Sequence, residues 1–188
     1  MTGPSFTDPS SAGPSPAGAD AAGITPGWVR TMTRYAAWQN GWMMDAVASL
    51  GDAEAARERG AFFGSILKTA NHLLWAGEIW LGRVRGDDAI PALAEDHLTL
   101  APDVAAWAAR RRTADVAWAD WAAELKAVEG TLTWRSGVVG GDVTLDLAVI
   151  LTHVFNHQTH HRGQIHAMLT AAGVKTGTTD LVFMGMGV

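Results

Sequence analysis

The helix that contains residues 152–169 constrains the fold most, because it places histidines where a core would normally receive leucine or valine. Its core-facing positions are spaced alternately by three and four residues, as on one buried helix face. These positions are Leu147, Ile150, Val154, His157, His161, Gln164 and Met168. His157 and His161 are four residues apart, so their Cβ atoms lie roughly 5–6 Å apart and both rings can reach one ion.

Two interpretations of this pair are open. A buried imidazole pair without partners would cost a few kcal/mol in lost hydration, so each ring must bind something. In the first interpretation, each ring hydrogen-bonds to a neighbour in a polar core network. In the second, the pair binds a metal ion, which is favoured because two histidines stand in register with further histidines beside them. A stable metal site needs at least three ligands, so a facing helix must supply the third.

Length, charge and hydropathy exclude several classes of protein. A chain of 188 residues forms one domain of ordinary size. The net charge is −5 and the only basic run is Arg110 to Arg112, so nucleic acid is not an expected partner. No apolar run approaches the roughly 18–20 residues that span a bilayer, and the N-terminus lacks the order of a signal peptide. We therefore expect a cytoplasmic protein without membrane contact.

The absence of cysteine limits the chemistry further. With no cysteine, the chain has no disulfide, no thiolate metal ligand and no cysteine nucleophile. Any metal must therefore be bound through nitrogen and oxygen, and any thiol chemistry must use a thiol that arrives with the substrate.

The remaining patterns predict an all-α fold, a four-helix bundle with a short extended hairpin before the last helix. Residues 1–24 are rich in Gly, Pro, Ser and Ala, which predicts a disordered tail ahead of a helical domain over residues 25–188. Glycines at 137–141, between two short extended segments, predict the hairpin. The expected helices cover about residues 26–50, 65–84, 103–129 and 145–172.

His72 is the natural third ligand. It lies on the inner face of the second predicted helix, among apolar and small residues. By itself it would be an ordinary core histidine, but it becomes a ligand candidate beside His157 and His161. The metal site predicted from the sequence is therefore His72, His157 and His161.

Three segments resemble the DinB/YfiT-like family of metal-binding helical bundles over about residues 28–183. They read Y-A-A-W-Q-N (35–40), G-A-F-F-G-S-I-L-K-T-A-N-H-L-L-W-A-G-E-I-W-L-G-R (60–83) and H-V-F-N-H-Q-T-H-H-R-G-Q-I-H (153–166). The resemblance implies a four-helix bundle, often a homodimer, with a three-histidine site. Its ligands would be the second-helix histidine and the first and last histidine of N-H-x-x-x-H-R-G-Q, again His72, His157 and His161. His160 departs from the pattern and points about 100° away from His161.

Relatives of this family include thiol transferases and mycothiol-linked isomerases. The resemblance therefore implies a metal-dependent enzyme, a thiol-dependent S-transferase or a hydrolase, acting on a small molecule such as a low-molecular-weight thiol. A water or a substrate thiol on the ion would react, with Asn156 and Gln164 orienting ligands or substrate. Zinc and nickel are the expected ions, and iron is also open. The alternative is a metal-binding or stress-response module without turnover; the roles of His153 and His160 stay open.

Tryptophan content raises the question of association. Nine tryptophans exceed what a small bundle easily buries, and aromatic side chains are enriched at interfaces. A homodimer contact would use the tryptophans of the first helix or those of the third, with core packing as the alternative. The two sets are Trp28, Trp38 and Trp42, and Trp107, Trp118 and Trp121.

Overall fold

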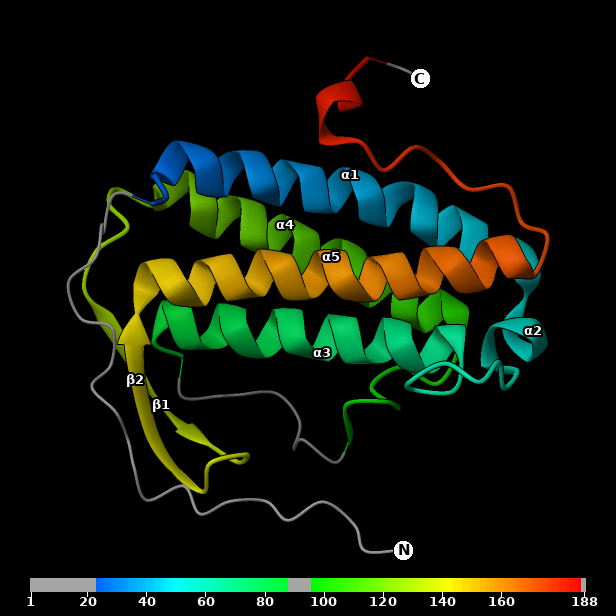
Figure 1. Cartoon of the computed structure of the whole chain (residues 1–188), viewed down its shortest axis with the longest axis horizontal. Coiled ribbons are helices and arrows are strands. Elements are labelled where there is room, and N and C mark those ends of the chain that lie inside the picture. Colours follow the sequence, from blue (N-terminus) through cyan, green and yellow to red (C-terminus); the bar gives the residue numbers. More distant parts are fainter. Residues whose placement is uncertain (1–22, 88–95, 187–188) are drawn as a thin grey trace, which may run out of the picture.

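Four long helices lie side by side in the computed structural model, which describes residues 23–87 and 96–186 (Figure 1). They are α1 (Pro26–Leu50), α3 (Ile66–Arg85), α4 (Val104–Glu124) and α5 (Leu147–Ala171). Two short elements, α2 (Asp52–Ala56) and η2 (Leu181–Phe183), complete the helical part. The expected helical bundle is confirmed, whereas residues 1–22 of the expected disordered tail lie outside the described residues.

Each helix contacts two neighbours. Helix α1 packs on α4 and α5, and α3 packs on the same two helices from the other side. Apolar residues form two separate core clusters, one around Met43, Leu73 and Trp107 and the other around Leu81 and Leu151. Between them the helices contribute buried polar side chains. These include Gln39, Asn40, Arg111, Gln158, His161 and Arg162. A polar layer therefore divides the core at mid-bundle.

Side-chain caps begin three of the long helices. Thr25 Oγ1 accepts a hydrogen bond from Trp28 N at 3.1 Å, and Pro26 occupies the first helical position. Ser65 and Asp103 cap α3 and α4 in the same way. These caps satisfy backbone N–H groups that have no partner within the helix, and so fix where each helix begins.

Two predicted helix boundaries, the end of α4 and the start of α5, are wrong. Helix α4 ends at Glu124 instead of near residue 129, although Leu125 and Val128 still pack on the core without helical backbone. Helix α5 begins at Leu147, later than expected, because residues 141–146 pair in a strand instead. Strand pairing accounts for the later start of α5, whereas residues 125–130 after α4 belong to neither a helix nor a strand.

The predicted hairpin is confirmed. Strands β1 (Thr131–Ser136) and β2 (Gly141–Asp146) pair antiparallel, with Trp134 opposite Val143. Trp134 contacts Trp80 of α3 at 5.2 Å between ring centroids, and the Arg83 guanidinium lies 4.6 Å from the Trp80 ring and 5.5 Å from the Trp134 ring. This cation–π contact fastens the hairpin to α3.

The segment after α5 returns to the first helix. Tyr35 donates a hydrogen bond to the carbonyl of Thr179 at 2.6 Å, and Gln39 donates to the carbonyl of Thr178 at 3.0 Å. Both donors belong to α1 and are buried. The last described segment therefore closes the bundle by satisfying polar groups of its first helix.

Burial separates the two tryptophan sets. Trp107 and Trp118 of α4 are 0% and 3% exposed and pack in the core, whereas Trp121 of the same set is partly exposed. Trp28, Trp38 and Trp42 of α1 stay partly exposed. Within the described residues, no helix combines the length and the apolarity that crossing a membrane requires.

Candidate metal centre

Three histidines converge in the polar layer between α3 and α5. The Nε2 atom of His157 lies 3.2 Å from Nε2 of His72 and 3.0 Å from Nε2 of His161. One ring nitrogen from each residue falls within 4.8 Å of the others. The structure thus brings together the same three residues that the sequence singled out. All donors in this group are imidazole nitrogens, without a carboxylate.

Hydrogen bonding determines which nitrogens carry protons. Gln164 Oε1 lies 2.7 Å from His161 Nδ1, and an amide oxygen can only accept, so this Nδ1 carries the proton and Nε2 a lone pair. His157 Nε2 faces both other Nε2 atoms, and one N–H cannot serve two such contacts in good geometry. A cation between the rings would satisfy all three lone pairs together.

The separations of the ring nitrogens fit a divalent ion. A zinc–nitrogen bond is about 2.0–2.1 Å long, so two nitrogens on a tetrahedral ion stand about 3.3 Å apart. The observed 3.0 and 3.2 Å lie close to that value. The Nε2 atoms of the three histidines thus stand nearly as far apart as they would on a bound divalent ion.

Burial keeps these rings neutral. Loss of hydration, with smaller repulsion from neighbouring histidines, lowers the pKa of His72 to about 3 and that of His157 to about 4. Burial also lowers the pKa of His161, although its hydrogen bond to Gln164 acts in the opposite direction. Neutral imidazole is the form that binds metal, so the rings need not release protons at neutral pH.

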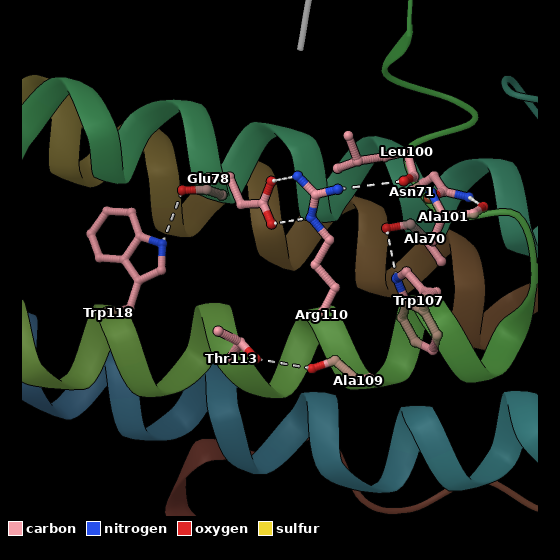
Figure 2. A network of polar contacts seen from close by, with 11 residues as sticks. Ala70, Asn71, Glu78, Leu100, Ala101, Trp107, Ala109, Arg110, Thr113 and Trp118 are labelled. Atoms are coloured by element: carbon pink, nitrogen blue, oxygen red, sulfur yellow. Dashed lines mark hydrogen bonds and ion pairs between the residues drawn. The ribbon is translucent and has the colours of Figure 1, made fainter. Parts of the chain in front are cut away.

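His97 supports the site, and sequence reasoning missed it. Its Nδ1 lies 2.9 Å from Nδ1 of His72, so it can accept the proton that leaves His72 Nε2 free. The segment is held in place by Asn71, whose amide exchanges hydrogen bonds with the backbone of Ala101 at 2.8 and 3.1 Å (Figure 2). His97 lies between helices and follows no periodic pattern, so only His72's neighbour Asn71 could have hinted at this contact.

Aromatic side chains form one wall of the site. The Phe63 ring lies 4.3 Å from that of His72 and 5.4 Å from that of His161, and Trp75 lies 5.9 Å from His72. Phe63 is placed by a tight turn in which Gly64 adopts φ +83°, a conformation that favours glycine. The turn therefore covers the histidines with an apolar ring.

The other candidates on α5 lie around this centre. His153 is exposed and contacts the His157 ring at 5.5 Å, while exposed His160 contacts the Gln164 amide at 3.2 Å. The His166 ring instead forms a hydrogen bond with the Thr176 hydroxyl. Asn156 is exposed, and no hydrogen bond among the described residues joins it to a histidine. Of the two predicted orienting amides, Gln164 contacts a ligand candidate and Asn156 does not.

The family comparison covers nearly the whole described chain. The model of the DinB family matches residues 23–186, which include all four long helices and the three histidines. A comparison with curated proteins finds no match.

Proposed function

The chain belongs to the DinB family, and from this premise we propose that it binds one divalent metal ion through His72, His157 and His161. We propose further that the ion serves a metal-dependent enzyme, of thiol-dependent S-transferase or hydrolase type, acting on a small molecule. One observation carries the proposal: three neutral ring nitrogens converge at 3.0 and 3.2 Å without a hydrogen-bond pattern that satisfies them.

The residues around the site suit a reactive ion. A divalent ion with only neutral ligands lowers the pKa of a water or thiol bound to it and polarises a bound carbonyl. Gln164 and His97 hold the rings of His161 and His72 in orientation from outside. Phe63 excludes water from one side, which strengthens electrostatic interactions within the site.

The alternative is a metal-binding module without turnover. A closed structural site has four protein ligands, whereas a catalytic site keeps a position open. Within the described residues the candidate group contains three ligands, and the rings of His72 and His157 are only partly buried. Three ligands and partial exposure support the enzyme over the module.

Measuring the metal content tests the site. Protein purified without chelator and without nickel resin should contain one divalent ion per chain. Zinc, nickel and iron all suit imidazole ligands, so elemental composition also identifies the ion. Alanine at His72, His157 or His161 should abolish the stoichiometric metal. His166→Ala is the matched control, because His166 lies on the same helix but outside the group, and it should retain the ion. Full metal content in His157→Ala would exclude the assignment.

A thiol titration tests the reaction class. The cobalt-substituted protein should develop sulfur-to-cobalt charge-transfer absorption when a small thiol is added, because the protein has no cysteine of its own to give such a band. The same titration of His157→Ala controls for thiol bound to free cobalt. If no cellular thiol produces the band, the transferase class is excluded, and hydrolysis or plain metal binding is left.

We also propose that the protein forms a homodimer. The partly exposed Trp28, Trp38 and Trp42 of α1 are candidates for the contact, since aromatic side chains are enriched at interfaces. Sedimentation velocity at micromolar concentration should give a dimer, and a monomer would refute this proposal.

A further inference from the structure

A second polar site lies in the middle of the bundle, on a different face of α5 from the histidines. It is a small cavity with room for about one water-sized sphere. Its polar lining consists of Thr33, Arg111, Asp115 and Gln158, and its apolar walls include Trp118 and Phe155. Thr33, Arg111 and Gln158 are 4%, 2% and 4% exposed, so the cavity lies deep in the protein.

Unused hydrogen-bond donors face this region. Arg111 Nε and Thr33 Oγ1 are buried and have no hydrogen-bond partner among the described residues. One oxygen of the lining's carboxylate is already engaged, because Asp115 Oδ1 accepts from Arg111 Nη2 and from Asn40 Nδ2, both at 2.8 Å. An occupant of the cavity would therefore meet an N–H and an O–H that lack an acceptor.

Positive charge exceeds negative charge around the cavity. Arg162 is 5% exposed and donates to Gln158 Oε1 at 3.2 Å and to Thr159 Oγ1 at 3.3 Å, and both acceptors are neutral. Two buried guanidinium groups thus stand near a single carboxylate. A water molecule would satisfy the donors but would leave this charge uncompensated.

The guanidinium of Arg111 is also held in place. A side chain at Gly77 of α3 would place its Cβ only 3.2 Å from Arg111 Nη1, so the glycine makes room for the buried cation. The neighbouring carbonyl of Gly77 accepts the indole N–H of Trp118, which is one wall of the cavity. The donors are therefore fixed before any ligand binds.

We propose that this cavity binds one small monovalent anion of halide size, chloride being the most available. Arg111 Nε and Thr33 Oγ1 donate to the anion, and its charge offsets the excess positive charge of Arg111 and Arg162. The site is independent of the metal proposed above, since its lining contains none of the histidines.

Thermal unfolding of the full chain provides the first test. Melting curves are recorded in potassium chloride, bromide and gluconate at equal ionic strength, because gluconate is too large for the cavity. Chloride and bromide should raise the midpoint saturably by about 3–8 °C above gluconate. Identical midpoints in all three salts would overturn the proposal. The shift must persist in His157→Ala, because an anion that instead binds to a metal ion would lose its site there.

Bromide also allows direct observation. Crystals of the wild type grown in bromide should give an anomalous peak in the cavity, within hydrogen-bond distance of Arg111 Nε and Thr33 Oγ1. An ordered water at this place, without anomalous signal, would overturn the proposal even if the melting temperature responds to salt.

Matched variants locate the effect. Thr33→Val keeps the shape of the side chain but removes a donor, and Arg162→Met removes the excess charge; each should reduce the halide-dependent shift to less than half. Arg112→Met is the control, because Arg112 is an exposed arginine of the same helix as Arg111, and its shift should equal that of the wild type. Equal shifts in all three variants would assign the effect to surface charge and refute the cavity site.

Discussion

Helix α3 packs on both of its neighbours through polar side chains, but the two interfaces differ in how these groups are satisfied. Toward α4 the polar side chains labelled in Figure 2 have partners: Arg110 forms two hydrogen bonds of 2.7 and 2.8 Å with the Glu78 carboxylate, and the indole N–H groups of Trp107 and Trp118 each donate to a carbonyl. Toward α5 the ring nitrogens of three histidines face one another at 3.0 and 3.2 Å.

This difference separates structure from function. The satisfied contacts of Arg110, Trp107 and Trp118 need no further partner, so this part of the α3–α4 interface holds the two helices together. Ring nitrogens whose lone pairs face one another suit a bound cation, so the α3–α5 contact is the candidate ligand site. Perturbing the first should change stability without changing metal content. Perturbing the second should change metal content, and should change stability through the loss of the bound ion.

Disrupting the α3–α4 interface should have the largest effect on stability. Trp107→Ala removes a side chain that is 0% exposed and its hydrogen bond to Ala70, so we expect a loss of about 3–5 kcal/mol in the free energy of unfolding. Urea unfolding followed by circular dichroism measures it, and the folded fraction should keep its metal. Trp38→Ala, at a partly exposed site on α1, should cost clearly less. A loss below about 1 kcal/mol for Trp107→Ala would contradict the central role of this interface.

Removing the ligand from the α3–α5 interface should follow. Metal binding to the folded state alone stabilises it by about 3–4 kcal/mol when the free ion exceeds its dissociation constant a hundredfold to a thousandfold. Chelation should therefore lower the melting temperature, while the far-ultraviolet signal of the helices is retained because both apolar clusters stay intact. If helicity vanished on chelation, the ion would be a structural element and the module without turnover would be favoured.

Acidification should destabilise the metal-free protein. The pKa values of His72 and His157 are about 3 and about 4 in the folded state, below the ordinary value of 6.5. Between these values the unfolded chain binds more protons, so the stability present above pH 6.5 is lost as the pH falls. Allowing for partial solvent exposure, we expect a loss of roughly 2 kcal/mol from about pH 7 to pH 5. Urea unfolding of chelated wild type against chelated His157→Gln checks this, and equal slopes would contradict the assigned pKa of His157.

Removing the contact between His97 and His72 should have the smallest effect, and this effect should be on metal affinity. His97→Ala removes the partner of His72 Nδ1 and should weaken metal affinity about tenfold without changing the stoichiometry. Competition with a chromophoric chelator measures the affinity. His160→Ala is the comparison, since His160 is exposed and outside the converging group, and it should change affinity less than twofold. Equal affinities in wild type and His97→Ala would remove His97 from the site.

The sequence predicted the part of the site that local spacing controls. His157 and His161 share a helix face because four residues make about one turn, and His72 follows from the inner face of its own helix. His97 was missed because it lies outside the helices, in the segment that the hydrogen bond between Asn71 and Ala101 holds against α3. No local sequence pattern encodes this contact. The buried Gln158 and Arg162 were missed as well. They lie on the second buried face of α5, and a polar pair in mid-helix looks like a solvated surface.

The fold was predicted to the same limit. Helix α1 begins at Pro26 as expected, because Thr25 and Pro26 are start signals that act locally. The start of α5 at Leu147 was misplaced, because residues 141–146 pair with β1, and the end of α4 at Glu124 was misplaced as well. Local start signals thus fixed the beginning of α1, whereas strand pairing set the beginning of α5.

The contact between α1 and the end of the chain has a consequence for synthesis. Tyr35 and Gln39 donate to the carbonyls of Thr179 and Thr178, 144 and 139 residues later. A ribosome adds roughly 5–20 residues per second, so these acceptors are translated about 7–30 s after their donors in α1. During that interval α1 must use water or other temporary partners for its buried donors. The bundle therefore reaches its final packing only after residues 178 and 179 have left the exit tunnel.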